Sequence, residues 1–222
     1  TVIGNISSSG KVKLLDLEFP QEFLKFFPGP KFGIQGIRDI IGVHDRPLLN
    51  NMIKPCTGLS PEKTAELAYQ AAVGGVDIIK DDELVANPPH CPLIERVKAV
   101  MPAIQNADRI KGEKTLFAFN ITDRADRIKE NALKALEAGA NCLMLNYATV
   151  GLDAARMITE DPEIDVPILG HSDYVGASTA CEWCGTSTKL MNAKLPRLAG
   201  LDMIIALSPY GKFPMLMDTF ID

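Results

Sequence analysis

The stretch Gly75-Val76-Asp77-Ile78-Ile79-Lys80-Asp81-Asp82-Glu83 sets a short apolar run directly before four charged residues. An unbroken run rich in β-branched residues is typical of a strand buried on both faces of a parallel sheet. Because side chains alternate along a strand, Lys80 and Asp82 point to one face, and Glu83 opens the following loop. The stretch therefore predicts a parallel sheet with charge gathered at the carboxyl end of this strand.

The same plan recurs in residues 71–79, 135–143 and 197–205. Each segment has a helix end, a glycine suited to a left-handed cap, one further residue, Asp or Asn, and then an apolar strand. The glycines lie 64 and 61 residues apart (139 − 75 and 200 − 139), about two strand–helix units each. This spacing favours a (β/α)8 barrel over an open doubly wound sheet. No Gly-x-Gly-x-x-Gly or Walker-type loop follows a predicted strand, which weakens the nucleotide-binding alternative.

Predicted strands alternate with predicted helices after about residue 48, and this order indicates βαβ units. The strands are 48–54, 76–80, 115–120, 141–146, 166–171 and 202–207, and the helices are 61–73, 92–107, 124–138, 152–159 and 186–198.

A closed barrel needs eight such units, and only six can be counted. We therefore expect residues 36–222 to form an incomplete (β/α)8 TIM barrel. Residues 1–35 are expected to be the tail of an α+β N-terminal domain. The chain is interpreted as an internal fragment of a longer polypeptide. An open six-stranded sheet leaves an unpaired edge, so we expect the fragment to be inactive and unstable alone.

The composition is that of an average globular domain, with 222 residues, 46% of them hydrophobic and 23% charged. A formal charge of −5 and a pI near 5.3 favour neither a nucleic-acid partner nor an acidic membrane surface. No apolar stretch reaches the roughly 18 residues that suggest a membrane span. Five cysteines in unpatterned positions fit a reducing compartment. We expect a cytoplasmic protein with no nucleic-acid or membrane partner.

Polar residues gather at the predicted carboxyl ends of the strands, where barrel enzymes place their active sites. They are Lys54 after the first strand, Lys80, Asp82 and Glu83 after the second, Asn120 after the third, Asn146 after the fourth, His171 after the fifth, and Ser208 and Lys212 beyond the sixth.

Each of these residues also has a structural explanation. Lys54 can be a solvated strand-end lysine, and the two carboxylates can cap the next segment. His171 can be a satisfied core histidine, while His44 and His90 are assigned to surface loops. The Cys181-Glu182-Trp183-Cys184 spacing resembles a redox or zinc pair, although no second pair completes a metal site.

Lys80 cannot ligate a metal as an ammonium, because that group has donors and no acceptor. Capped by CO2 as a carbamate, it would carry two oxygens and a negative charge. Together with Asp82 and Glu83, such a carbamate would make a site for a hard cation.

Two motifs resemble the rubisco large-chain superfamily: residues 52–60, with Lys54-Pro55-Cys56-Thr57-Gly58, and Lys80-Asp81-Asp82-Glu83 in the second strand. Residues 32–38 and 46–49 are similar to the family's entry into its first barrel strand. The resemblance spans the whole chain, from the end of the N-terminal domain through strand six.

The resemblance implies a carbamate of CO2 on Lys80 and Mg2+ held with Asp82 and Glu83. It implies that Lys54 moves a proton near the substrate carbonyl and that His171 is the strand-five histidine. Chelation of a hydroxy-ketone or diketone would stabilise an enediolate. Lys54, near the metal and the carbonyl, could serve as a base or an acid if local positive charge lowers its pKa. Substrate binding is assigned to Asn120, Ser208 and Lys212.

Departures from the carbon-fixing pattern point to the rubisco-like branch. Cys56 stands where carboxylases carry a second lysine, and Ile205 and Ala206 occupy the region of a substrate-contacting histidine. Residues 206–213 share only Gly-Lys with the mobile loop, and 170–177 lack the basic cluster.

We therefore expect Mg2+-dependent enolisation of a phosphorylated keto-sugar or keto-sugar acid. An enolase, isomerase, decarboxylase or transcarboxylase outcome stays open. The Lys-Pro-x-x-Gly-Leu-Ser-Pro form favours the sugar-acid group over the methylthio diketopentyl phosphate enolases. A true ribulose-bisphosphate carboxylase and a non-catalytic homologue are the alternatives. The family builds its site between paired subunits, which implies a homodimer or a higher homo-oligomer.

Overall fold

The sheet is open and entirely parallel in the computed structural model, which describes residues 4–211 and 214–221. Its spatial order follows the chain, so each strand pairs with the next barrel strand. The strands in that order are β2 (Asn50–Met52), β3 (Ile78–Lys80), β4 (Leu116–Asn120), β5 (Cys142–Leu145), β6 (Ile168–Gly170) and β8 (Met203–Ile204). Within the described residues, β2 and β8 are the free edges. The six predicted strands are confirmed, each with narrower bounds, as an incomplete (β/α)8 barrel.

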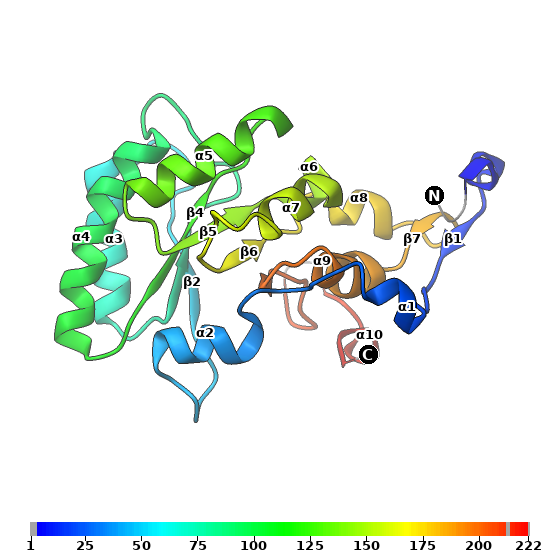
Figure 1. Cartoon of the computed structure of the whole chain (residues 1–222), viewed down its shortest axis with the longest axis horizontal. Helices are drawn as coiled ribbons and strands as arrows, with labels where there is room; N and C mark the ends of the chain where they lie inside the picture. The colour runs from blue at the N-terminus through cyan, green and yellow to red at the C-terminus, as the bar shows by residue number, and fades with distance from the viewer. Residues whose placement is uncertain (1–3, 212–213, 222) are drawn as a thin grey trace.

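Helices connect successive strands and cover one face of the sheet (Figure 1). Helix α3 begins as predicted, because the Ser60 side chain accepts a hydrogen bond from the Lys63 N–H at 3.2 Å and Pro61 occupies the first turn. The connecting helices are α3 (Pro61–Val73), α4 (Leu93–Lys111), α5 (Ala125–Glu137), α6 (Tyr147–Val150), α7 (Leu152–Thr159), α8 (Val175–Thr179) and α9 (Leu195–Leu198).

Alternation along the strands divides the core into two clusters. On the helix-covered face, Ile79 of β3, with Phe117 and Phe119 of β4, packs among the buried side chains of α3 and α4. The opposite face carries Ile78, Leu116, Ala118, Cys142, Met144 and Leu169. Helix α2 (Gly33–Ile41), which lies below the strands in Figure 1, covers part of this second face with two buried isoleucines. We did not predict this helix.

The repeated Gly-x-Asp/Asn motif joins neighbouring strands at the amino end of the sheet. All three glycines have positive φ, namely 94° at Gly75, 102° at Gly139 and 87° at Gly200, as the left-handed cap requires. The Asn141 side chain accepts a hydrogen bond from the Phe117 N–H at 2.9 Å. Asp77 and Asp202 accept bonds from the N–H groups of Leu49 at 2.7 Å and Ile168 at 2.9 Å. Each side chain thus binds the backbone of the preceding strand.

The prediction of one helix over 186–198 is wrong at its start. Strand β7 (Gly185–Thr186) pairs in parallel with β1 (Lys13–Leu14), far away in sequence. A π-helical turn, Leu190–Lys194, then leads into α9. Pro196 follows this turn and has no N–H for the carbonyl four residues earlier, a setting in which regular α-helical bonding fails.

The N-terminal segment contacts the sheet close to the predicted domain boundary. Lys31 donates to the carbonyl of Ile164 at 2.7 Å, and Asp202 accepts bonds from the N–H groups of Phe32 and Gly33 at 2.7 and 3.0 Å. The boundary between residues 35 and 36 stays a prediction. The remaining elements are η1 (Gly4–Ser9), α1 (Gln21–Leu24) and α10 (Met217–Ile221).

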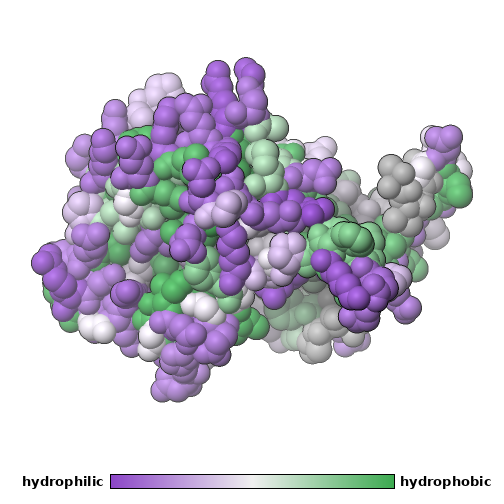
Figure 2. All heavy atoms as spheres, in the orientation of Figure 1, coloured by the Kyte–Doolittle hydropathy of each residue, from purple (hydrophilic) through white to green (hydrophobic). Residues whose placement is uncertain are grey.

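The face shown in Figure 2 is mostly hydrophilic over α4 and α5, with apolar side chains visible between the helices. In the described part of the chain, none of the helices has both the length and the apolar character needed to cross a bilayer.

Candidate active site

The predicted site residues share one end and one face of the sheet. Lys80 follows Ile78 by two positions, and Asn120, Asn146 and His171 similarly follow residues of the second core cluster. A period of two therefore places all four beyond that cluster, at the carboxyl ends of their strands. Backbone pairing continues past β6, because the His171 N–H donates to the Leu145 carbonyl at 2.8 Å.

Glu83 lies between Lys80 and His171. Its Oε2 is 3.7 Å from Lys80 Nζ and 3.5 Å from His171 Nε2. Neither contact has hydrogen-bond geometry, so this buried oxygen has no hydrogen-bond partner in the described structure. Lys80 is 3% exposed, and its Nζ donates to the Asp81 carbonyl at 2.7 Å. A buried amine thus lies next to a carboxylate oxygen that has no hydrogen bond.

Lys54 reaches the same cluster from the neighbouring segment. Its Nζ is 2.5 Å from Oδ2 of the buried Asp82, while 54% of the Lys54 side chain is exposed. The other Asp82 oxygen accepts the Leu84 N–H at 3.0 Å. Lys54 therefore presents a charged amine at the boundary between the cluster and solvent.

Asn120 and Asn146 hold the loop that carries the two carboxylates. The Asn120 amide donates to the carbonyls of Asp82 at 3.3 Å and Glu83 at 3.1 Å, and its oxygen accepts the Thr122 N–H at 3.1 Å. The Asn146 amide donates to the Glu83 carbonyl at 3.0 Å, which leaves its buried Oδ1 unpartnered. Substrate binding by Asn120 stays a prediction, because the described contacts of its side chain are to this loop.

Burial and neighbouring charge act differently on the ionisable groups. Burial lowers the pKa of Lys80, because a charged amine is poorly solvated there. Burial also lowers the pKa of His171, and the charge of Lys80 adds to the effect. Burial acts to raise the pKa of Asp82, but the bonds from Lys54 and the Leu84 N–H outweigh it and keep the value low.

Among the described residues the pKa of Lys54 is not lowered, and a lowering by the positive charge of a metal site stays a prediction. The hydrogen bond to the Asp82 carboxylate raises the pKa of Lys54 instead. The Asp82 carboxylate therefore has the largest effect on this amine, and it favours the charged ammonium form of Lys54.

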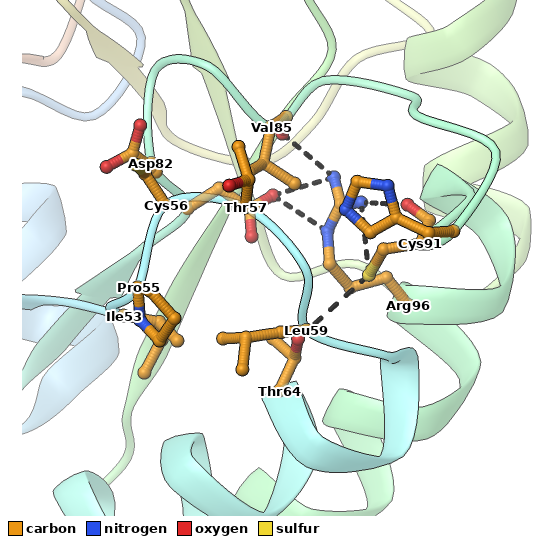
Figure 3. Close-up of a pocket in the computed structure, with 12 residues that line it drawn as sticks. Ile53, Pro55, Cys56, Thr57, Leu59, Thr64, Asp82, Val85, Cys91 and Arg96 are labelled. Carbon is orange, nitrogen blue, oxygen red and sulfur yellow. Dashed lines mark hydrogen bonds and ion pairs between the residues drawn. The ribbon is translucent and has the colours of Figure 1, made fainter.

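Arg96 is a site-organising residue that we did not predict. It is fully buried, and its guanidinium lies 2.9 Å from Oδ2 of the equally buried Asp81. It also donates to the carbonyls of Cys91 at 2.7 Å and Ala86 at 2.8 Å. Figure 3 shows Arg96 reaching from α4 to the loop that carries Val85 and Cys91.

A sequence signal for Arg96 was present. It stands in the apolar stripe of α4 formed by Leu93, Val97 and Val100, where a charged residue requires a buried partner. Asp81 provides that partner and also accepts the Asn120 N–H at 2.9 Å. Arg96 thereby connects helix α4 to the start of the loop that carries Asp82 and Glu83.

The structure does not bring every predicted residue into the cluster. Ser208 is exposed, and its carbonyl accepts the N–H groups of Gly211 at 3.2 Å and Met215 at 3.3 Å. Among the described residues, no hydrogen bond or ion pair connects Ser208 with the carboxylates. Lys212 lies outside the described residues. His44 and His90 are exposed, as predicted.

A metal site at this position needs more than the carboxylates. Across residues 4–211 and 214–221, no group of three His, Cys, Asp or Glu side chains is placed to hold a metal ion. Asp82 and Glu83 would supply two hard-oxygen ligands to such a site, and a carbamate on the adjacent Lys80 would supply the third. The unpartnered oxygen of Glu83 and the buried amine fit such a set.

Comparison with known proteins agrees with the fold and the motifs. Residues 33–214 match the family model "Ribulose bisphosphate carboxylase large chain, catalytic domain". The chain is 53% identical over all its 222 residues to a ribulose bisphosphate carboxylase-like protein of Archaeoglobus fulgidus, covering 51% of that protein. It is 43% identical over 211 residues to a 2,3-diketo-5-methylthiopentyl-1-phosphate enolase of Bacillus cereus, covering 95% of this chain and 51% of the enzyme.

Solved structures agree as well. A rubisco-like protein (MtnW) from Alicyclobacillus acidocaldarius superposes with a TM-score of 0.94 at 33% identity, covering 100% of this chain and 56% of that one. A dimeric archaeal rubisco from Hyperthermus butylicus gives a TM-score of 0.87 at 35% identity, over 91% of this chain and 48% of that one. The chain spans about half the length of the curated relatives it matches. Because the family model covers most of the chain and the relatives align over nearly all of it, the chain belongs to the ribulose bisphosphate carboxylase large-chain family.

Proposed function

We propose that this chain supplies the metal-binding and proton-transfer residues of a rubisco-like enolase-type active site. Asp82, Glu83 and the carbamate of Lys80 would hold Mg2+. The observation that carries the proposal is the buried Lys80 amine beside the unpartnered Glu83 oxygen, 3.7 Å away. A bare ammonium leaves that oxygen without a hydrogen bond, whereas a third anionic ligand would turn the same geometry into a cation site.

The carbamate forms when the neutral Lys80 amine adds to CO2 and releases one proton. Bound Mg2+ would polarise the substrate carbonyl and stabilise the negative charge that develops on its oxygen. The loop that carries Asp82 and Glu83 is held in place before any ligand binds. The Asn120 and Asn146 side chains donate to its carbonyls, and Arg96 pairs with the buried Asp81 at its start. Such preorganisation reduces the reorganisation required during the reaction.

Lys54 is the residue that we assign to proton transfer. Its Nζ faces the cluster through Asp82, and its stem extends toward solvent, so a substrate carbon next to a chelated carbonyl would lie within its reach. Removal of a proton from that carbon requires the neutral amine, so Lys54 would first release one Nζ proton to Asp82 or to solvent; Nζ would then accept the proton from the substrate carbon. His171 adds a second nitrogen, Nδ1, which is buried and unpartnered in the described structure.

The substrate that we propose is a phosphorylated 2,3-diketone. Relatives that carry a named activity include diketone phosphate enolases, at 43% identity over 95% of this chain. This likeness extends over far more residues than the short motif that favoured the sugar acids. The carboxylase alternative is disfavoured by Cys56, which stands in place of the second lysine of carbon-fixing members. We also propose a homo-oligomeric enzyme, because a dimeric rubisco is among the structural neighbours.

The test compares Lys80→Ala with Lys63→Ala in the intact enzyme. Lys63 is an exposed lysine of α3 whose side chain pairs, among the described residues, with Glu66 alone, and it serves as the matched control. Enolisation of 2,3-diketo-5-methylthiopentyl-1-phosphate is followed by absorbance, and Mg2+ binding is followed by calorimetry with and without CO2. Lys80→Ala should lose turnover and CO2-dependent Mg2+ binding, while Lys63→Ala keeps both.

Unchanged turnover in Lys80→Ala would refute the assigned role of Lys80. Incorporation of labelled CO2 into a phosphorylated product from ribulose 1,5-bisphosphate would favour the carboxylase instead. If the wild type binds Mg2+ in a CO2-dependent way and turns over a sugar-acid phosphate but not the diketone, the metal assignment stands and the substrate assignment is wrong.

A further inference from the structure

Two thiols that have no part in the proposed active site follow helix α8 in the chain. Cys181 and Cys184 are free cysteines in the loop between α8 and β7, and their Sγ atoms lie 2.9 Å apart. A disulfide bond is about 2.05 Å long, so an approach of roughly 0.9 Å would join the two sulfurs. The other three cysteines of the chain, Cys56, Cys91 and Cys142, lie in other elements.

The loop is anchored at both ends, which keeps the two thiols close together. On one side, the Thr179 hydroxyl donates to the Val175 carbonyl within α8 at 3.0 Å. On the other side, the Gly185 N–H donates to the Val12 carbonyl at 3.1 Å as β7 pairs with β1. Lys13 connects the two ends of the loop. It belongs to β1, which pairs with β7, and its Nζ donates to the carbonyls of Thr179 at 3.1 Å and Cys181 at 2.6 Å. A fixed loop removes most of the entropy cost of bringing two sulfurs together.

The two thiols differ in exposure and in acidity. Cys181 is exposed, whereas Cys184 is half-buried. The hydrogen bond from Cys184 lowers the pKa of Cys181, and the Lys13 charge acts in the same direction. The same interaction raises the pKa of Cys184. The exposed sulfur is therefore the better nucleophile, and the less exposed one lies 2.9 Å from it.

A metal is a poorer explanation of the pair. Zinc in a structural site takes four ligands, and two cysteines supply only half of them. Within the described ranges, no further His, Cys, Asp or Glu gathers with these two into a metal-binding group. A pair of thiols in contact, without further ligands, suits thiol–disulfide chemistry.

We propose that Cys181 and Cys184 form a redox-active dithiol site that exchanges with low-molecular-weight disulfides. The Cys181 thiolate attacks one sulfur of the incoming disulfide, forms a mixed disulfide and releases one thiolate. The Cys184 sulfur then gives up its proton and attacks Cys181 Sγ, which closes the protein disulfide and releases the second thiolate. The protein loses two electrons and two protons, and the co-reactant is reduced to two thiols.

Trp183, the only tryptophan of the chain, lies between the two cysteines and is 66% exposed. A disulfide adjacent to an indole quenches its fluorescence, so the emission of the whole protein reports on this one loop. Trp183 has no part in the proposed active site.

The experiment equilibrates the whole chain with graded ratios of reduced to oxidised glutathione and then titrates thiols in denaturant. The thiol count should fall from five to three, with tryptophan emission falling over the same range of ratios. Cys56→Ala, which removes a thiol outside the pair, should likewise lose two thiols. The Cys181→Ser variant should keep all its remaining thiols and its tryptophan emission over that range of glutathione ratios. Cys184→Ser should stop at a mixed disulfide on Cys181, seen by mass spectrometry as one bound glutathione.

Three results would overturn the proposal. One is a thiol count that stays at five while glutathione becomes fully oxidised. Another is wild-type protein that accumulates one stable glutathione adduct, because Cys184 then fails to resolve it. The third is a loss of two thiols that occurs only through disulfide-linked dimers on a non-reducing gel.

Discussion

Replacing Arg96 with methionine removes the cation that holds Asp81 in the core. Methionine keeps much of the length and the apolar stem of arginine but none of its five donors. The variant leaves the Asp81 carboxylate with the Asn120 N–H at 2.9 Å as its remaining direct hydrogen bond among the described contacts. The carbonyls of Cys91 and Ala86 also lose the donor that reaches them at 2.7 and 2.8 Å.

Breaking a buried ion pair by removing one partner costs about 3–5 kcal/mol, because it leaves an uncompensated charge. Both side chains qualify as buried, with Arg96 0% and Asp81 3% exposed. Since total stabilities are about 5–15 kcal/mol, Arg96→Met should take away a large share of the free energy of unfolding. Burial already raises the pKa of Asp81, and the variant should raise that pKa further, because it removes the Arg96 charge that acts to lower it.

The assay is urea unfolding of the intact protein followed by far-ultraviolet circular dichroism. Asp81→Asn combined with Arg96→Met removes both charges and keeps an acceptor for the Asn120 N–H. The double variant should be about 2 kcal/mol more stable than Arg96→Met alone, as expected for coupled residues. Arg124→Met is the matched control, because Arg124 is 68% exposed in its pair with Asp126 and should change stability by at most about 0.5 kcal/mol.

Additive effects of the two substitutions would refute this reasoning, because they would show that Arg96 and Asp81 do not stabilise one another. A cost for Arg96→Met as small as that of Arg124→Met would refute it as well. In that case the loop that carries Asp82 and Glu83 would have to be held by the asparagine bonds alone.

Two further predictions concern the amino end of the sheet. Burial acts to raise the pKa of Asp77, but the hydrogen bonds from Arg46 and the Leu49 N–H outweigh it and lower the value. Its contribution to stability is therefore complete above its unfolded pKa of about 3.9 and is lost as the pH falls through the folded value. The stability difference between wild type and Asp77→Asn should accordingly shrink from pH 7 toward pH 3 in chemical denaturation; a constant difference would contradict the assignment. Asn141→Ala removes both bonds of its amide, to the Phe117 N–H and the Thr115 carbonyl at 2.9 Å each, and should cost about 1–3 kcal/mol in thermal unfolding. A change no larger than that of an exposed surface substitution would count against a sheet-joining role for this amide.

Local pattern was sufficient to predict the framework of the molecule. The left-handed glycines, the Ser60 cap and the alternation of apolar segments each act over a few residues, so the strands and most helices were recognisable without tertiary information. Lys80, Asn120 and His171 all follow predicted strands, and the candidate site could be proposed as a set because barrel enzymes place their active sites at the carboxyl ends of the strands.

Other features depend on residues far apart in the chain. The pairing of β1 with β7 replaces the predicted start of a helix, because backbone partners about 170 residues away compete with local propensity. The raised pKa of Lys54 follows from the position of Asp82, 28 residues away, which sequence spacing did not reveal.

The sequence by itself determined the repeating strand–helix order, the end of the sheet where charge gathers, and the presence of a lysine between carboxylates. Only the tertiary structure decided that Arg96 neutralises Asp81, that one Glu83 oxygen is left without a hydrogen bond, and that Cys181 contacts Cys184. The reason is physical: periodicity and capping are set by neighbouring residues, whereas the charge state and partners of a buried group are set by whatever the fold packs against it.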